Sequence, residues 1–193
     1  MEILILSLKN AIDRRNYMIK LFNNQTCTFI DSLSPNNIDI NLLKYSNKYL
    51  SKEAVATFET HRKTIELSKQ KDNYVLILED DATPYFDDYL NRIDKLISIA
   101  PEFDIMVLGW IKGTPFRVNP KSEFIKVRNF LGMHSYIINT KNADKILNVL
   151  DRPNQHIDKR ISKLISSNKI IGIFPKEKIF YQQKSFKTQI PKK

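Results

Sequence analysis

Short, continuous apolar runs that alternate with helix-period segments restrict the fold more than any other feature of this sequence. The runs at 2–8, 74–78 and 104–110 are short for helices, and they are too continuous for strands with one exposed face. Strands of this kind are typical of parallel sheets covered by helices on both faces. The segment 51–70 places Ala54, Phe58, His61 and Ile65 on one helical stripe, and the apolar residues of 10–22 lie roughly at helical spacing, so both favour helices.

The same alternation continues to the end of the chain. Further strands are predicted at 27–31, 134–138 and 170–174, and further helices at 87–99, 140–150 and 156–165. No repeat, low-complexity tract or linker interrupts the pattern. We therefore expect an α/β fold with a mainly parallel central sheet flanked by helices, in a single domain over 1–193.

Cysteine content and hydropathy exclude several classes of protein. Cys27 is the only cysteine, which excludes an internal disulfide framework and a multi-cysteine zinc site. No apolar run approaches the ~20 residues of a membrane span, and the first ten residues lack a basic leader. We expect a cytoplasmic protein without a span or an export signal.

The positive charge is concentrated in the second half of the chain. Residues 1–100 hold 13 Lys and Arg against 14 Asp and Glu, and residues 101–193 hold 18 against 7, so the halves carry −1 and +11 of the formal +10. Such a surface attracts nucleic acid, anionic lipid headgroups or phosphorylated sugars. A lysine-rich surface that only keeps the protein in solution explains the charge equally well.

A cluster of three carboxylates follows one of the buried strands, in the stretch "NYVLILEDDATPYF" (73–86). In open α/β sheets ligands bind beyond the carboxyl ends of strands, where Glu79, Asp80 and Asp81 are expected. Adjacent carboxylates repel, so the cluster favours water or a cation. Extended backbone would turn Glu79 and Asp81 to the same side, which suits Mg²⁺ or Mn²⁺. An acidic turn before a helix N-terminus is the alternative.

Several motifs in a fixed order resemble glycosyltransferase family 25, the bacterial enzymes that modify lipopolysaccharide. "LSLKNAIDRR" resembles a first strand followed by two arginines, "ATFETH" a helix with a histidine, and "LILEDDA" the family's L-E-D-D strand end. "GMHSYIINTKNADKIL", "DRPNQHID" and "IFPKEKIFYQQKS" resemble later motifs, so the resemblance spans about 3–185. The sequence departs from the family at Ser7, usually Asn, at Thr60, usually Ser, and at Ala56 and Thr57, where Gly-Cys is common.

The resemblance implies an enzyme with a GT-A-like, Rossmann-like domain. It implies transfer of a hexose, galactose or glucose, from a UDP-sugar to a saccharide acceptor such as lipopolysaccharide or lipooligosaccharide, with inversion. Residues 1–100 would bind the nucleotide sugar, and the basic residues 101–193 would lie on the acceptor side. A lipid-linked acceptor would place the enzyme at the anionic inner face of the membrane, and nucleic acid would not be a partner.

The resemblance also assigns roles around the acidic cluster. Glu79 and Asp81 would hold Mn²⁺ or Mg²⁺ between the protein and the UDP phosphates, as a D-x-D motif does. Asp80 would contact the donor sugar or the ribose. Arg14 and Arg15 would lie near the diphosphate, where an arginine adds a bidentate contact, with one of the two an ordinary surface residue.

Four further donor-side residues keep two interpretations each. Ser7 and Asp31, at the ends of the first two strands, would bind the nucleoside or only cap the strands. His61 lies on the apolar stripe of its helix, so support of the acidic loop is favoured over direct binding. For His134 a donor contact and a structural role stay open. Gln182 or Gln183 would contact the diphosphate from the C-terminal side.

Asp158 is the candidate base that deprotonates the acceptor hydroxyl in an inverting transfer, with a helix-capping role as the alternative. Two other functions compete with a glycosyltransferase. A metal-dependent nuclease or phosphohydrolase would use the same carboxylates, but the sequence offers no compact set of further Asp or His ligands. A non-catalytic nucleic-acid-binding domain would use the basic half, but it leaves the strand-end carboxylates unexplained.

Overall fold

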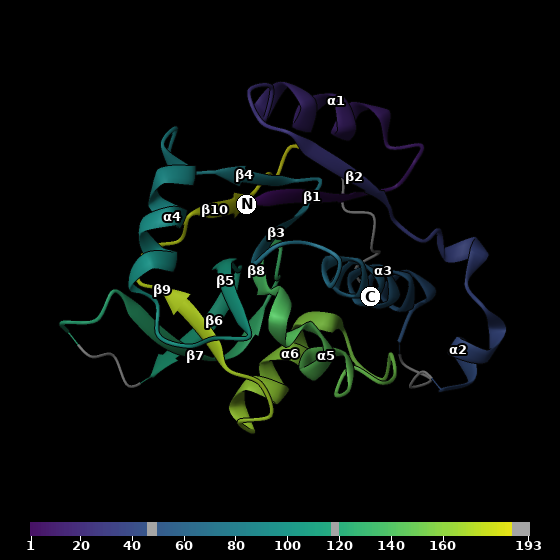
Figure 1. Cartoon of the computed structure of the whole chain (residues 1–193). Helices are drawn as coiled ribbons and strands as arrows, with labels where there is room; N and C mark the ends of the chain where they lie inside the picture. Colours follow the sequence, from purple (N-terminus) through teal and green to yellow (C-terminus); the bar gives the residue numbers. More distant parts are fainter. Residues whose placement is uncertain (46–49, 117–119, 187–193) are drawn as a thin grey trace.

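A mixed eight-stranded sheet forms the centre of the protein (Figure 1). The computed structural model describes residues 1–45, 50–116 and 120–186. The strand order is β2-β1-β3-β8-β5-β9-β7-β6, and β4 and β10 form a separate two-stranded sheet. The strands are β1 (Glu2–Ser7), β2 (Cys27–Asp31), β3 (Tyr74–Glu79), β4 (Ala82–Pro84), β5 (Ile105–Gly109), β6 (Lys112–Phe116), β7 (Phe124–Leu131), β8 (Ser135–Asn139), β9 (Gly172–Pro175) and β10 (Phe180–Gln182).

Helices cover both faces of the central sheet. They are α1 (Ile12–Leu21), α2 (Ile40–Tyr45), α3 (Lys52–Ser68), α4 (Tyr89–Ile99), α5 (Ala143–Leu147) and α6 (Ile157–Ser166), with 3₁₀ turns at η1 (Pro35–Asn37) and η2 (Thr140–Asn142). Alternate residues of one strand enter two cores, as period-two geometry requires: Leu4 packs with Phe58 of α3, and Ile3 packs with Met18 of α1. The predicted α/β fold with a central sheet flanked by helices is confirmed. No helix in the described ranges is long and apolar enough to cross a membrane.

The expectation of a mainly parallel sheet is wrong. β1 runs parallel to β2 and β3, and β5 runs parallel to β9, whereas the β3–β8, β5–β8, β7–β9 and β6–β7 pairs are antiparallel. A parallel return needs a long crossover, usually a helix. Between β5 and β8 the chain instead forms the hairpin β6–β7, and β8 then runs antiparallel to both of its neighbours. β8 is nonetheless buried on both faces, so its apolar run did not reveal its direction.

The first three strands create the place where a ligand fits. From β1 the chain passes through α1 to β2 on one side, and it later returns through α3 to β3 on the other side of β1. This reversal of winding is a topological switch point, beside which open α/β sheets bind ligands at the carboxyl ends of the strands. Ser7 ends β1 and Glu79 ends β3, so the acidic cluster lies at this point.

Candidate active site

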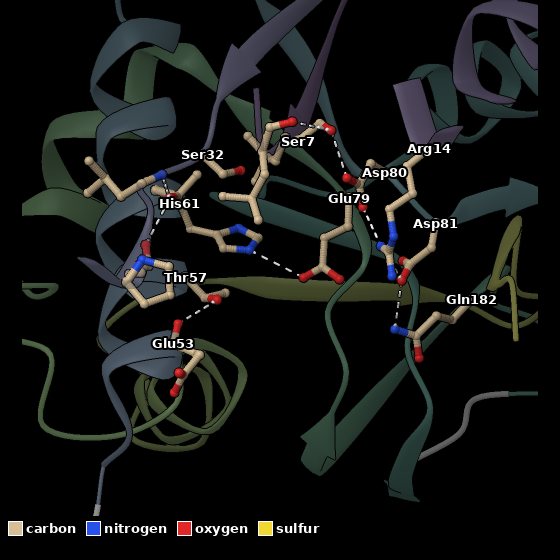
Figure 2. A pocket seen from close by; sticks show the side chains of 16 residues that line it. Ser7, Arg14, Ser32, Glu53, Thr57, His61, Glu79, Asp80, Asp81 and Gln182 are labelled. Atoms are coloured by element: carbon tan, nitrogen blue, oxygen red, sulfur yellow. Dashed lines mark hydrogen bonds and ion pairs between the residues drawn. The ribbon is translucent and has the colours of Figure 1, made fainter. Parts of the chain in front are cut away.

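A cavity of about 140 Å³ opens at the carboxyl ends of β1 and β3 (Figure 2). Seven of the residues predicted from the sequence line it: Ser7, Arg14, His61, Glu79, Asp80, Asp81 and Gln182. β1 and β3 supply the strand-end residues, α1 supplies the arginine, α3 the histidine and β10 the glutamine. Arg15, Asp31, His134 and Asp158 do not line the cavity.

Asp80 is fully engaged by neighbouring side chains. Ser7 Oγ donates a hydrogen bond to Asp80 Oδ2 at 2.7 Å, and Arg14 Nη1 lies 2.5 Å from Asp80 Oδ1. Asp80 is 5 % exposed and Arg14 is 8 % exposed, so this ion pair is largely withdrawn from water. A buried pair of this kind holds the guanidinium in one position, because either charge alone would be costly there.

Asp81 keeps one oxygen unsatisfied. Its Oδ2 accepts from Arg14 Nη1 at 3.2 Å and from Gln182 Nε2 at 3.3 Å, while its buried Oδ1 has no hydrogen-bond partner in the described part of the chain. Burial, and then the nearby charge of Glu79, raise the pKa of Asp81 to about 7. The carboxylate therefore lies where another positive charge would stabilise it.

Gln182 reaches this carboxylate because β10 pairs with β4 directly after the acidic cluster. Gln182 lies opposite Ala82 in the two-stranded sheet, and the Gln183 amide donates to the Asp81 carbonyl at 2.7 Å. The C-terminal part of the described chain thus forms one wall of the cavity. Of the two glutamines considered from the sequence, Gln182 is the one whose side chain lines it.

Glu79 lies between the wall formed by β10 and the helix α3, and it is contacted by His61 of α3. His61 Nε2 is 3.3 Å from Glu79 Oε1, and His61 Nδ1 is 2.8 Å from the hydroxyl of Tyr136 on β8. The histidine is 1 % exposed, which confirms that it faces inward as its helical register predicted. Figure 2 shows Glu79 between His61 and the group formed by Arg14, Asp80 and Asp81.

Arg15 and Asp31 pair with each other beside the cavity. Arg15 Nη2 donates to the Ser7 carbonyl at 3.0 Å and to Asp31 Oδ1 at 2.5 Å, and its guanidinium lies 5.1 Å from the centre of the Phe29 ring. The hydrogen bond from Arg15 lowers the pKa of the exposed Asp31. The pair joins the ends of β1 and β2, an arrangement that fits the capping interpretation of Asp31.

The side chains of His134 and Asp158 contact the protein backbone and do not line the cavity. The ring nitrogens of His134 are 3.2 Å from the Gly132 carbonyl and 3.3 Å from the Phe180 carbonyl, and burial lowers the pKa of the ring. Asp158 Oδ2 accepts from the Gly132 amide, and Asp158 Oδ1 from the Lys159 amide, both at 2.7 Å. These bonds fix the first turn of α6 against the segment that enters β8.

The sequence reasoning missed the wall contributed by α3 and by the loop after β2. Glu53, Thr57 and Ser32 also line the cavity. Ser51 begins α3 as its N-cap, since its side chain accepts from the Ala54 amide, and this sets the register of the helix. Glu53 and Thr57 precede His61 by eight and four positions, so the stripe that turned His61 inward could have revealed them.

The described residues do not form a complete metal site from protein side chains alone. Among the described residues no group of three or more His, Cys, Asp or Glu side chains is arranged to hold a metal ion. The unsatisfied Asp81 Oδ1 and the part-exposed Glu79 carboxylate are two hard oxygen donors in one cavity. They fit a cation such as Mg²⁺ or Mn²⁺ that takes its other ligands from a substrate and from water.

Comparison with known protein families identifies the family of this chain. The model of glycosyltransferase family 25, described as an LPS biosynthesis protein, matches residues 1–161. The chain belongs to glycosyltransferase family 25. No curated protein sequence matches it significantly.

One solved glycosyltransferase structure shares the overall fold of this family 25 protein. The crystal structure of a glycosyltransferase involved in glycosylation of the major capsid of PBCV-1 is similar to it, with a TM-score of 0.53 and 13 % identity over 97 % of this chain and 95 % of that one. The inositol-1-phosphate CTP transferase from T. maritima has a TM-score of 0.49 and 10 % identity, over 98 % of this chain and 74 % of that one. The matched family region includes the acidic cluster and ends before Gln182.

Proposed function

We propose that this family 25 enzyme transfers a hexose, galactose or glucose, from a UDP-sugar to a saccharide of lipopolysaccharide, lipooligosaccharide or another surface glycan, with inversion and with the help of Mn²⁺ or Mg²⁺. The observation that carries the proposal is the cavity at the switch point, where the three carboxylates of the L-E-D-D strand end and the guanidinium of Arg14 converge. The alternatives, a nuclease or phosphohydrolase and a non-catalytic nucleic-acid-binding domain, have no comparable support from the family match.

The charges in the cavity support a requirement for a cation. Glu79, Asp80 and Asp81 together outweigh Arg14 by two negative charges when all are ionised. A diphosphate brings further negative charge and would be repelled unless a divalent ion entered with it. Glu79 and Asp81 would hold that ion. When bound, the ion would stabilise the negative charge that develops on the departing UDP.

Other residues of the cavity would each contact a different part of the donor. Arg14 would face the diphosphate, and Asp80 with Ser7 keeps its guanidinium in place. The rest of the cavity, bounded by Ser32, Thr57 and Glu53, offers hydroxyl and carboxylate groups to the ribose and the base. Gln182 approaches from the opposite wall and would donate to a phosphate oxygen.

Asp158 is the candidate for the base that deprotonates the acceptor hydroxyl. A general base must lie within hydrogen-bond reach of the hydroxyl that it deprotonates. Both Asp158 oxygens accept backbone amides of the protein, which supports a structural role instead.

The enzyme would act at an anionic membrane surface, because a lipid-linked acceptor is anchored there. Three lysines on α6 and in the following turn are exposed: Lys159, Lys163 and Lys169. Each lysine near such a surface contributes about 1 kcal/mol of attraction.

Donor binding and turnover test this function directly. We expect UDP-galactose or UDP-glucose with Mn²⁺ to raise the melting temperature by mass action, whereas single-stranded oligonucleotides do not. A radiolabelled hexose should then pass to a deacylated lipooligosaccharide acceptor. Stabilisation by oligonucleotides together with no response to any UDP-sugar would reject the proposal. Arg14→Gln serves as the control, since it should lose donor binding.

A further inference from the structure

Three side chains form a line from the core to the cavity, joined by one hydrogen bond and one close contact between ring nitrogen and carboxylate. The Tyr136 hydroxyl lies 2.8 Å from His61 Nδ1, and His61 Nε2 lies 3.3 Å from Glu79 Oε1. Tyr136 and His61 are each 1 % exposed, whereas the Glu79 side chain is 30 % exposed and lines the cavity. The line therefore has one end in the dry interior and the other at the cavity.

The donors and acceptors along this line have one consistent direction. Burial raises the pKa of Tyr136 well above its usual 10, so the phenol keeps its proton. A buried hydroxyl is costly unless it donates, and His61 Nδ1 is the acceptor beside it. With Nδ1 as the acceptor of the tyrosine proton, the ring proton lies on Nε2, 3.3 Å from a Glu79 carboxylate oxygen that only accepts. The other tautomer would turn a lone pair of Nε2 toward Glu79.

The surrounding structure keeps the three groups in place. Tyr136 on β8 lies opposite Ile77 on β3, two residues before Glu79, and the Glu79 amide donates to the His134 carbonyl at 2.9 Å. The ring of His61 stacks on that of Tyr136, with 5.7 Å between centroids and 29° between planes. Strand pairing therefore fixes the separation of the tyrosine and the glutamate that the histidine bridges.

We propose that Tyr136 is a positioning residue for the donor site that acts through His61. Its hydroxyl selects the Nε2–H tautomer of His61, and the histidine then holds Glu79 Oε1 so that Oε2 is presented to the cavity. The proposal rests on the proposed function for the ligand, a divalent cation bound together with UDP. A residue that does not line the cavity thus controls the affinity of the site.

The tautomer of His61 can be measured by NMR in the metal-free protein, without a ligand and without an activity assay. The chain has three histidines, and in a ¹⁵N-labelled sample the His61 signals are those that disappear in His61→Leu. Long-range ¹H–¹⁵N spectra of the metal-free protein should show His61 protonated at Nε2. In Tyr136→Phe, which removes only the hydroxyl, a mixture of the two tautomers is expected. Protonation at Nδ1 in the wild type, or an unchanged tautomer in Tyr136→Phe, would overturn the proposal.

A double-mutant cycle separates this role from simple packing. Mn²⁺ affinity is measured by calorimetry with saturating UDP. Tyr136→Phe should weaken it by about 10- to 100-fold, the usual effect of losing a group that orients a metal ligand. In the His61→Leu background the same change should have no further effect, because the connection to Glu79 is already lost. His61→Asn, which is too short to reach Glu79, replaces His61→Leu if that variant does not fold.

Tyr89→Phe is the matched control, since Tyr89 is a buried tyrosine on α4 that does not line the cavity. It should leave the Mn²⁺ affinity unchanged. An equal loss from Tyr136→Phe in both backgrounds would mean that Tyr136 acts by packing, and the proposal would be wrong. If the wild type binds neither UDP nor Mn²⁺, the proposed function fails, while the spectra still decide whether Tyr136 sets the tautomer.

Discussion

Asp81→Asn should stabilise the metal-free protein while removing its response to the metal. Asp81 is buried beside Glu79 and Asp80, and its pKa is raised from the ordinary 3.8 to about 7. A pKa that is higher in the folded state means that stability is full below the unfolded value and is lost as the pH rises through the folded one. The wild type should therefore lose stability between about pH 4 and pH 7 in EDTA.

The size of the effect follows from the same shift. The rise from 3.8 to about 7 corresponds to about 4 kcal/mol for ionising Asp81 in the folded protein. Asn cannot ionise, so the variant should avoid this cost at pH 8 and resemble the wild type at pH 4. For a chain of this length 1 kcal/mol shifts the melting temperature by about 2–4 °C, which predicts a gain of roughly 10 °C at pH 8.

Melting curves in EDTA at pH 4, 6 and 8 measure this difference for both proteins. Adding Mn²⁺ and UDP at pH 8 should then raise the melting temperature of the wild type but not of Asp81→Asn. Asp88→Asn is a control, because this exposed carboxylate at the start of α4 does not line the active-site cavity. A variant that is less stable than the wild type at pH 8, or a difference that does not depend on pH, would refute the reasoning.

Three further predictions concern residues outside the cavity. Asp158→Ala should lower the free energy of unfolding by about 1–3 kcal/mol, because both carboxylate oxygens accept backbone amides, and it should leave UDP affinity unchanged. Urea unfolding measures the first effect and calorimetry the second, and an intact fold with lost turnover would instead support Asp158 as the base. Burial raises the pKa of the Cys27 thiol, so its reaction with a disulfide reagent should be slower at pH 7.5 than that of a free thiol peptide and should accelerate in urea. Equal rates in the folded and unfolded protein would contradict this. Charge reversal at three exposed lysines should release the protein from anionic vesicles at low salt without changing donor hydrolysis, and salt-insensitive sedimentation would contradict membrane docking; the three are Lys159, Lys163 and Lys169.

The sequence predicted the parts of the fold whose signal is local. The apolar runs located β1, β3, β5, β8 and β9, because burial on both faces leaves a continuous apolar pattern. The edge strand β2 was located by its short segment 27–31, although none of its residues is fully buried. The strand β6 was missed because its residues are mostly polar and part-exposed, and β7 was missed because exposed polar residues interrupt its apolar ones. Strand direction was also missed, since it depends on the connection between strands and not on the side chains within them.

The candidate site was predictable where it lies at strand ends. Glu79, Asp80, Asp81 and Ser7 converge because β1 and β3 are parallel neighbours that end together. The placement of Asp158 could not be read from the sequence, because its amide partner Gly132 comes from a different segment of the chain. Whether a helix-start carboxylate faces a ligand or the protein is decided by such tertiary contacts.

The wall formed by β10 has a consequence for the order of events during synthesis. Gln182 meets Asp81 across about a hundred residues of chain, and β10 can pair with β4 only after the chain as far as β10 has left the ribosome. A nascent chain that has emerged only as far as α6 already contains β1, β3 and the acidic cluster, but its carboxylates face water on the side that β10 later covers. Translation therefore produces the charged floor of the cavity before the wall that encloses it, so the cavity is complete only once β10 has emerged.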